Sequence, residues 1–261
     1  MGSNLFRSAE RKKAKLRLAL CGAAGSGKTM SSLLIAKGLG DKIAVIDTER
    51  GSSELYSDIS DFDVCVLEPP FKVEKYIEAI DAANEAKYDV IIIDSISHLW
   101  AGEGGLLDQH TAITSKTANS YTAWSKITPL HNRFIDSMLQ SQSHVIATMR
   151  SKTEYVLERN EQSGKTTIRK VGLAPVQRDT VTFEFTIVFD LDSDHMAVAS
   201  KDRTAMFSNT YFRPSEEIGR KIKKWLDLGV EGGAAQIKHD SIPIVEEENS
   251  VVKESVKDAG W

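Results

Sequence analysis

One segment constrains the fold of this chain more than any other: residues 22–29, which read Gly-Ala-Ala-Gly-Ser-Gly-Lys-Thr. They fit the pattern G-x-x-x-x-G-K-[ST] in full, directly after an apolar run and at the start of a helical pattern. Glycines in such a loop let successive backbone N–H groups curl around an oxyanion, and the positive end of the helix dipole strengthens its binding. We therefore expect a strand, a loop and a helix arranged around a phosphate group.

The ligand that we expect in this loop is ATP with Mg²⁺. Lys28 would reach the β- and γ-phosphates, and the hydroxyl of Thr29 would ligate the metal ion. The predicted nucleotide-binding residues are Gly22, Ala23, Ala24, Gly25, Ser26, Gly27, Lys28, Thr29 and Met30. A second Ser-Gly-Lys-Thr at 163–166 lacks the leading glycine and follows no strand, so we predict that it is the polar tip of a hairpin.

Short apolar runs alternate with helical patterns through the first 150 residues. Five of these runs predict buried strands, at 16–21, 43–47, 64–67, 90–94 and 144–149. Apolar residues recur at helical spacing over 73–83, and a longer helical stretch covers about 119–141. This alternation predicts an α/β fold, in which a mostly parallel central sheet has flanking helices on both faces.

The pattern changes after residue 150. Apolar and polar side chains alternate strictly over 181–191, which predicts an antiparallel strand with one face in water, and 218–226 carries the apolar stripe of a closing helix. We expect a basic arm at 1–15, one main domain at 16–229 and an acidic tail at 230–261. The tail has no sustained period and is expected to be mostly disordered.

The net charge of −4 belongs to this tail, which holds seven acidic and three basic residues. The acidic balance of the whole chain therefore does not exclude a nucleic-acid partner. The longest aliphatic run, 90–93, is too short to span a bilayer, and no apolar stretch follows the N-terminal charges. Two cysteines, Cys21 and Cys65, are too few for a disulfide framework. We expect a cytoplasmic protein, in the host cytoplasm if it is phage-encoded, without a membrane partner.

Two acidic residues follow apolar strands and are candidates for the reaction chemistry. Asp94 ends the run 90–94, where a Walker B aspartate holds the Mg²⁺ shell, so Thr29 and Asp94 are the predicted metal ligands. The next residue is Ser95 and not glutamate, so a base that activates water must come from elsewhere. Glu49 closes the second strand, whose carboxyl end neighbours the phosphate loop in such sheets, and is the candidate base.

These motifs resemble those of the RecA-like recombinases and the related RadA and DnaB ATPases. The residues that carry the resemblance are the phosphate loop, Ile-Asp-Thr-Glu at 46–49, Tyr-Asp-Val-Ile-Ile-Ile-Asp-Ser at 88–95 and Lys-Asp-Arg at 201–203. The resemblance implies a RecA-like P-loop core with a C-terminal antiparallel β extension, and Glu49 as the catalytic glutamate. It also implies that Lys201 and Arg203 reach the γ-phosphate of a neighbouring subunit, where two cations stabilise transition-state charge.

Longer segments are similar to the phage-encoded RecA-like ATPases of the Sak single-strand annealing group. These segments are FRSAERKKAKLRLALCGAAGSGKT at 6–29, HVIATMRSKTEYV at 144–156, KVGLAPVQRD at 170–179, FTIVFDLD at 185–192 and SKDRTAMF at 200–207. Phe6-x-x-Ala9 is also similar to the polymerisation motif of archaeal and eukaryotic recombinases. The resemblance implies self-association into a ring or filament on single-stranded DNA, for recombination or annealing.

In RecA-like ATPases the DNA-binding loops follow the fourth and fifth core strands, which places them here at about 101–120 and 150–180. The second segment is rich in basic residues, and such residues bind a phosphate backbone through counterion release. The predicted DNA contacts are Arg150, Lys152, Arg159, Lys165, Arg169 and Lys170. Residues 1–17 form a second basic island, Thr148 and Arg150 are candidate γ-phosphate sensors, and the glycines of 101–120 indicate a mobile segment.

Two other functions stay open at this point. A P-loop kinase would transfer the phosphate to a small acceptor instead of water. A nucleotide-gated assembly protein would bind ATP and hydrolyse little of it, while the acidic tail docks a partner protein. None of the six histidines has the spacing of metal ligands.

Overall fold

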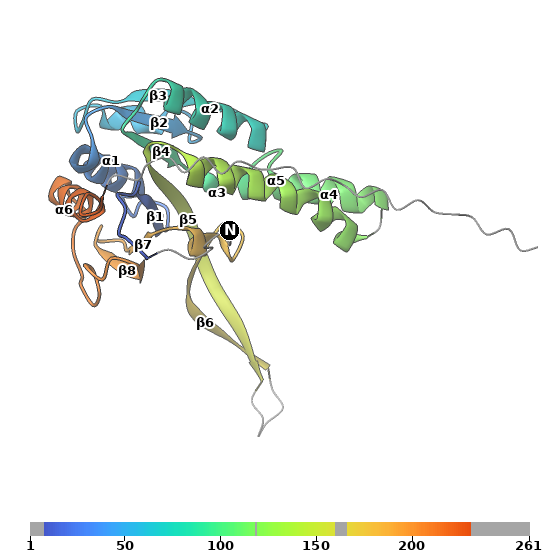
Figure 1. Cartoon of the computed structure of the whole chain (residues 1–261). Helices are drawn as coiled ribbons and strands as arrows, with labels where there is room; N and C mark the ends of the chain where they lie inside the picture. Colours follow the sequence, from blue (N-terminus) through green and yellow to red (C-terminus); the bar gives the residue numbers. More distant parts are fainter. Residues whose placement is uncertain (1–7, 118, 160–165, 231–261) are drawn as a thin grey trace, which may run out of the picture. The chain divides into compact units, whose positions relative to one another are not determined.

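The computed structural model describes residues 8–117, 119–159 and 166–230; at 117, 153–159 and 166–173 it describes the backbone only. Seven strands form one sheet in the order β3-β2-β4-β5-β1-β7-β8, and β6 pairs with the outer part of β5 (Figure 1). The strands are β1 (Arg17–Gly22), β2 (Ile43–Asp47), β3 (Asp63–Val66), β4 (Val90–Asp94), β5 (His144–Arg159), β6 (Thr166–Pro175), β7 (Ile187–Leu191) and β8 (Ala197–Asp202). The predicted α/β class with a mostly parallel sheet is confirmed.

Helices cover both faces of the sheet. They are α1 (Lys28–Leu39), α2 (Val73–Glu85), α3 (Ile96–Ala101), α4 (Leu106–Thr117), α5 (Ser120–Gln140) and α6 (Glu216–Leu226), with two short 3₁₀ helices, η1 (Ser52–Tyr56) and η2 (Val181–Glu184). Apolar residues of α2 and α5 pack on one face, and those of α1 and α6 pack on the other. The helices α1 and α6 cross closely, because a Cβ atom on Gly219 would lie 2.1 Å from the Ile35 carbonyl oxygen.

The continuous apolar runs are explained by burial on both faces. In β4, Ile91 and Ile93 belong to the cluster with α2 and α5, whereas Val90 and Ile92 belong to the cluster with α1 and α6. Successive side chains of a strand point to opposite faces, so a strand covered on both sides has no face that points to water, and its sequence is apolar up to its end. The predicted strands at 43–47 and 90–94 are confirmed to the residue.

Two predicted strands differ from the structure. The segment 64–67 was expected to be a buried strand, but β3 is the edge of the sheet, and Asp63, Cys65 and Val66 are exposed. The alternating segment 181–191 begins with the 3₁₀ helix η2, and only Ile187–Leu191 forms a strand. That strand, β7, is parallel to β1 on one side and antiparallel to β8 on the other, so the prediction of antiparallel pairing was half right.

The two segments expected to bind DNA differ from each other in structure. Most of 101–120 is the helix α4, so the prediction of a mobile glycine-rich loop was wrong there. The second segment is a long antiparallel ribbon of β5 and β6, in which Arg159 is paired with Thr166. The hairpin tip predicted at 163–166 falls mostly on residues 160–165, which are outside the described part of the chain.

Two arginines of the basic island at 1–17 make contacts within the folded domain. Arg17 is buried, and its guanidinium donates to four carbonyl oxygens at the start of β1 and around the C-terminal end of α5, those of Leu16, Leu139, Ser141 and Ser143. A cation at this place complements the negative end of the α5 dipole. Arg11 lies 4.3 Å from the centre of the Trp225 ring. These two arginines therefore stabilise the domain, and Arg17 is not available to DNA.

A buried histidine gives the fold a dependence on pH. The Leu16 backbone N–H donates to Nδ1 of His144 over 2.9 Å, so the native ring is neutral. Burial, with the nearby charges of Lys15 and Arg17, lowers the pKa of His144 to about 4. The unfolded chain takes up a proton near the ordinary histidine pKa of about 6.5, whereas the native ring does so only near 4.

We therefore expect the free energy of unfolding to be unaffected by His144 above pH 6.5 and to fall as the pH is lowered from 6.5 to 4. The shift corresponds to about 3 kcal/mol at the lower limit. His144→Asn keeps an acceptor for the Leu16 N–H but does not titrate, so its unfolding free energy should fall less over this range. Urea unfolding at several pH values measures both curves. Equal slopes for the two proteins would contradict the assignment.

Candidate functional site

The carboxyl ends of four parallel strands meet at one edge of the sheet. In the order β2-β4-β5-β1 each strand is parallel to its neighbour, and the register pairs Asp47 with Asp94 and Gly22 with Arg150. The residues that follow these strands are therefore brought together although they are far apart in the sequence. Ligands of open α/β sheets bind at this edge.

The phosphate loop has the backbone of an anion-binding cradle. Gly25 and Gly27 have φ angles of +79° and +80°, in the left-handed region that favours glycine. The Nζ atom of Lys28 lies 3.1 Å from the carbonyl oxygen of Gly22 and 2.8 Å from that of Ala23, so the ammonium group folds over the loop. The hydroxyl of Ser26 is buried without a hydrogen-bond partner. These donors fit the phosphates of a nucleotide.

Asp94 and Thr29 form the donor set expected for magnesium. Thr29 donates its hydroxyl to Oδ2 of Asp94 over 2.5 Å, and Thr148 donates to Oδ1 over 2.5 Å. Burial raises the pKa of Asp94, and these two hydrogen bonds oppose that effect. Within the described residues no group of three His, Cys, Asp or Glu side chains could hold a metal by itself. A hydroxyl and a carboxylate suit Mg²⁺, whose remaining ligands are phosphates and water.

Glu49 is placed by a turn that Asp47 organises. The carboxylate of Asp47 is fully buried and accepts the N–H groups of Glu49, Gly51 and Ser53, together with the Ser53 hydroxyl. This turn leads the chain out of β2 and into η1. Asp47 is thus a positioning residue, and Glu49, two residues later, is the acid that reaches the site.

One cavity of about 440 Å³ unites these groups. Its walls include the phosphate loop, both candidate acids and a guanidinium: Ala24, Gly25, Gly27, Lys28, Thr29, Glu49, Ser52, Leu55, Tyr56, Asp94 and Arg150. Glu49 and Arg150 form an ion pair there, with the Arg150 Nη2 atom 3.0 Å from Glu49 Oε1. The structure therefore brings the predicted residues Lys28, Thr29, Glu49 and Asp94 into one site.

Sequence reasoning missed one wall of this cavity. Ser52, Leu55 and Tyr56 of η1 line it, and Leu55 is 82% exposed. No motif marks these residues, but their position directly after Glu49 was a usable signal, because a loop that holds the base must also border the phosphates. An exposed leucine and a tyrosine offer an apolar surface for a nucleobase.

Other predicted site residues lie outside the cavity. Lys201 donates to the carbonyl oxygens of Thr182 and Phe183, and Arg203 donates to that of Phe183, so both cations lie against η2. Lys152 is exposed at the base of the β5–β6 ribbon. Only the backbone of Arg159, Arg169 and Lys170 is described, and Lys165 and Phe6 lie outside the described residues.

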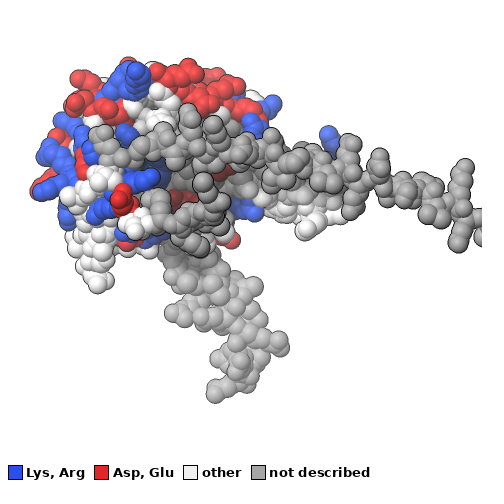
Figure 2. All heavy atoms as spheres, in the orientation of Figure 1, with Lys and Arg blue, Asp and Glu red and all other residues white. Residues whose placement is uncertain are grey.

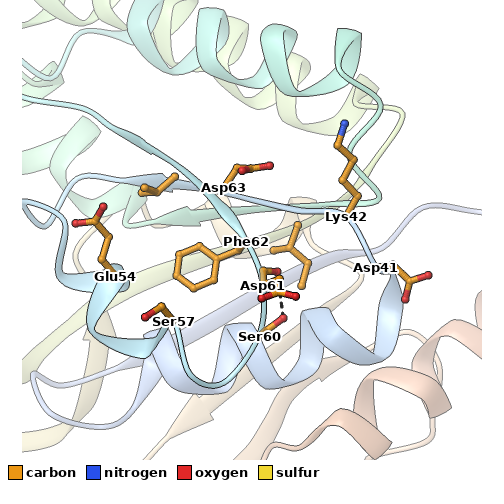
Figure 3. A pocket seen from close by; sticks show the side chains of 10 residues that line it. Asp41, Lys42, Glu54, Ser57, Ser60, Asp61, Phe62 and Asp63 are labelled. Carbon is orange, nitrogen blue, oxygen red and sulfur yellow. Dashed lines mark hydrogen bonds between the residues drawn. The ribbon is translucent and has the colours of Figure 1, made fainter.

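A larger hollow of about 580 Å³ lies beside β2 and β3 and is unsuited to phosphate. Asp41, Glu54, Asp61 and Asp63 surround it with Lys42, and Phe62 lies between them (Figure 3). Carboxylates at this density repel a phosphate group. Of these two cavities, the smaller one at the phosphate loop is the one whose lining suits a phosphate group.

Substitution of the loop lysine tests this site. We expect Lys28→Ala to weaken the binding of ATP at least tenfold, because it removes the cation that faces the β- and γ-phosphates, each charge-assisted hydrogen bond of this kind being worth about 1.5–3 kcal/mol. Titration of a fluorescent ATP analogue measures the affinity. Lys37→Ala, at an exposed lysine of the same helix, is the control and should bind as the wild type does. Equal affinities of Lys28→Ala and the wild type would place the nucleotide elsewhere.

A match to a protein family agrees with this geometry. Residues 14–216 match the model of the family AAA_24, described as an AAA domain. No curated protein matches the sequence. A solved structure of the RadB recombinase is similar at 18% identity and a TM-score of 0.44, over 79% of this chain and 90% of that one. No helix in the described part of the chain is long and apolar enough to cross a membrane. With more than two thirds of its residues matched, the chain belongs to the AAA_24 family of P-loop NTPases.

Proposed function

We propose that the protein is a Mg²⁺-dependent ATPase that assembles on single-stranded DNA and acts in recombination or annealing. The observation that carries the ATPase proposal is the single cavity that holds Lys28, Thr29, Asp94 and Glu49. Each of the four has the chemistry for one part of ATP hydrolysis, and the sheet topology brings them together.

The roles of these residues follow from their positions. Lys28 binds the β- and γ-phosphates, while Thr29 and Asp94 hold Mg²⁺, which neutralises charge on the phosphate oxygens when it is bound. Glu49 accepts a proton from the attacking water, since Ser95 stands where other P-loop enzymes have a glutamate. Thr148 holds the second oxygen of Asp94 and so keeps that carboxylate directed at the site.

The β5–β6 ribbon is the element that we propose for DNA. It extends away from the central sheet (Figure 1), and it begins next to Arg150, which lines the cavity at the phosphate loop. Its sequence carries the basic residues predicted to bind phosphates. The face of the protein that carries α2 is unsuited to DNA, because acidic side chains gather on it (Figure 2). The helix α2, which lies there, exposes Glu74, Glu78, Asp81 and Glu85.

Self-assembly would bring Lys201 and Arg203 to the nucleotide of a neighbouring subunit. Both cations donate to carbonyl oxygens of η2, which leaves their positive charge unneutralised by those contacts. Phe183, whose backbone carbonyl oxygen accepts from both cations, is 65% exposed. A cationic pair beside an exposed aromatic ring suits an interface with a second copy of this chain.

A kinase is the second candidate, because a further cavity borders the nucleotide site. This cavity of about 750 Å³ shares Glu49 and Arg150 with it and is also lined by Arg50, Phe71 and His98. A small phosphate acceptor bound there would lie next to the γ-phosphate. The product distinguishes the two functions, since a kinase transfers phosphate to the acceptor and an ATPase releases it.

The rate of phosphate release tests the leading proposal. We expect turnover of ATP to rise at least several-fold when single-stranded DNA is added at low salt, and Glu49→Gln to lower turnover about 100-fold while ATP still binds. Asp58→Asn, at an exposed acid near η1, is the control. Absence of stimulation by DNA would contradict the DNA proposal, and full activity of Glu49→Gln would exclude Glu49 as the base.

The second test concerns the neighbouring subunit. Arg203→Ala should bind ATP with unchanged affinity but hydrolyse it at least tenfold more slowly, because the lost cation acts only on the transition state in an assembled neighbour. Binding is measured by titration and turnover by phosphate release. A mixture with Lys28→Ala subunits should recover part of the activity, as each variant then supplies what the other lacks. Wild-type turnover in Arg203→Ala would refute this role.

A further inference from the structure

The cavity of about 750 Å³ beside the nucleotide site, called the adjoining cavity below, has an apolar part and a polar part. Residues at and after the end of the edge strand β3 supply most of the apolar surface, and these are Val66, Leu67 and Pro69. The α3 segment and the ends of β2 and β5 supply the polar groups: Thr48, Glu49, Arg50, His98, Glu103 and Arg150. Ligand sites have volumes of about 300–1,000 Å³ and combine apolar walls with a few polar groups that fix the orientation of the ligand. The adjoining cavity therefore suits a flat ligand with polar groups along one edge.

His98 is held in the lining of this cavity by two contacts. Its ring stacks on Phe71, with the ring centres 5.0 Å apart and an angle of 16° between the planes. Its Nδ1 atom lies 2.7 Å from the hydroxyl of Thr48, which also accepts the Ser95 N–H over 2.8 Å. The Ser95 carbonyl oxygen is farther from this hydroxyl, at 3.2 Å, so the hydroxyl proton is donated to Nδ1 of His98. A rotation of the ring would break both contacts.

The other ring nitrogen of His98 is a donor for a ligand. Burial and the charge of Arg150 lower the pKa of His98, which keeps the ring neutral at physiological pH. A neutral imidazole whose Nδ1 accepts a hydrogen bond carries its proton on Nε2. Within the described part of the chain Nε2 has no hydrogen-bond partner, and His98 lines the adjoining cavity. The Nε2–H group is thus available to a molecule bound there.

Glu103 supplies an acceptor to the same cavity. It follows the last turn of α3, which closes where the Gly102 N–H donates to the His98 carbonyl over 2.8 Å. The carbonyl of Glu103 accepts the Phe71 N–H over 2.8 Å, so its backbone is fixed, while the residue itself is exposed. An ionised carboxylate only accepts hydrogen bonds, whereas the Nε2–H of His98 only donates. The two side chains are complementary to a ligand edge that has an amino group next to an acceptor nitrogen.

Cytosine and adenine have such an edge, and thymine has the reverse. Cytosine presents its N4 amino group beside the N3 acceptor, and adenine presents its N6 amino group beside the N1 acceptor. Thymine presents the O4 acceptor beside the N3–H donor, so it would place O4 against the carboxylate and N3–H against the imidazole donor. Polar groups that are buried without a partner are costly. A base in the adjoining cavity would therefore be distinguished by its hydrogen-bonding edge.

The adjoining cavity borders the base of the ribbon that we propose for DNA. Arg150 lines the cavity, and the next residue, Ser151, is the first of β5 that pairs with β6. Arg50 also lines it and is exposed, so its guanidinium suits a backbone phosphate at the cavity. Proteins that read an unstacked base enclose it in a pocket, where hydrogen bonds reach its pairing edge and apolar side chains cover its faces.

We propose that the adjoining cavity binds one unstacked base of single-stranded DNA and prefers cytosine or adenine to thymine. This inference rests on the proposed function and adds the recognition of a base to it. His98 donates its Nε2–H to the acceptor nitrogen of the base, and Glu103 accepts the amino group. Apolar surface from the end of β3 covers the ring.

Two oligonucleotides of equal length, oligodeoxycytidine and oligothymidine, test the preference. Both have pyrimidine bases, so the comparison isolates the hydrogen-bonding edge. By fluorescence anisotropy at constant salt, we expect the wild type to bind oligodeoxycytidine at least about fivefold more tightly, the order of discrimination that a correctly paired base edge gives. Glu103→Ala should bring the two affinities within about twofold, and so should His98→Phe, which can keep the stack on Phe71 but has no donor. Glu78→Ala, at an exposed acid of α2, is the control and should keep the preference.

The results that overturn the proposal differ from those that overturn the proposed function. Equal affinities of the wild type for the two oligonucleotides, or an unchanged preference in both variants, would overturn the base-binding site alone. Transfer of phosphate from ATP to free deoxycytidine would also overturn it, because the cavity would then hold the acceptor of a kinase. Failure of the proposed function has another signature: neither oligonucleotide binds to the wild type or to the control.

Discussion

The site depends on a buried carboxylate that three elements share. Asp94 ends β4 and accepts hydroxyl groups from Thr29 at the start of α1 and from Thr148 in β5. A buried carboxylate is costly unless donors surround it, so these two hydrogen bonds favour one register of β4 against β5 and one position of the phosphate loop. A shift of one residue in either strand would turn its side chain to the opposite face of the sheet.

The same strand order links the nucleotide cavity to the ribbon. Because β5 lies between β4 and β1, its carboxyl end emerges beside the phosphate loop, and it continues without a break into the ribbon with β6. Thr148 and Arg150 are two residues apart on this strand, and both contact an acid of the site. A short stretch of one strand therefore contacts the candidate metal ligand Asp94 and the candidate base Glu49, and it continues into the element proposed for DNA. This continuity connects the ribbon that we propose for DNA directly to the proposed site of hydrolysis.

Local patterns predicted much of this arrangement. Short-range sequence patterns were enough to predict the phosphate loop, the strand ends at Asp47 and Asp94 and the long helix α5. Glycine spacing and apolar runs indicate such elements without knowledge of the tertiary structure. Burial depends on neighbours, and sequence periodicity does not report them. The run containing Cys65 was therefore assigned to the interior although β3 is an edge strand, and Arg17 was counted as a surface charge although it lies under α5. The alternation at 181–184 looked like a strand because a 3₁₀ turn also places some of its side chains inside. The Glu49–Arg150 pair joins residues 101 positions apart, and only the sheet order brings them together.

A structure with Mg²⁺ and a non-hydrolysable ATP analogue is the most direct measurement of the central claim, that one sheet edge assembles the whole catalytic site. The account predicts the metal ion between Thr29 and Asp94, the γ-phosphate against Lys28, and the Glu49 carboxylate facing it across the same cavity. A nucleotide bound outside this cavity, or a metal ion without Asp94 in its surroundings, would contradict the account.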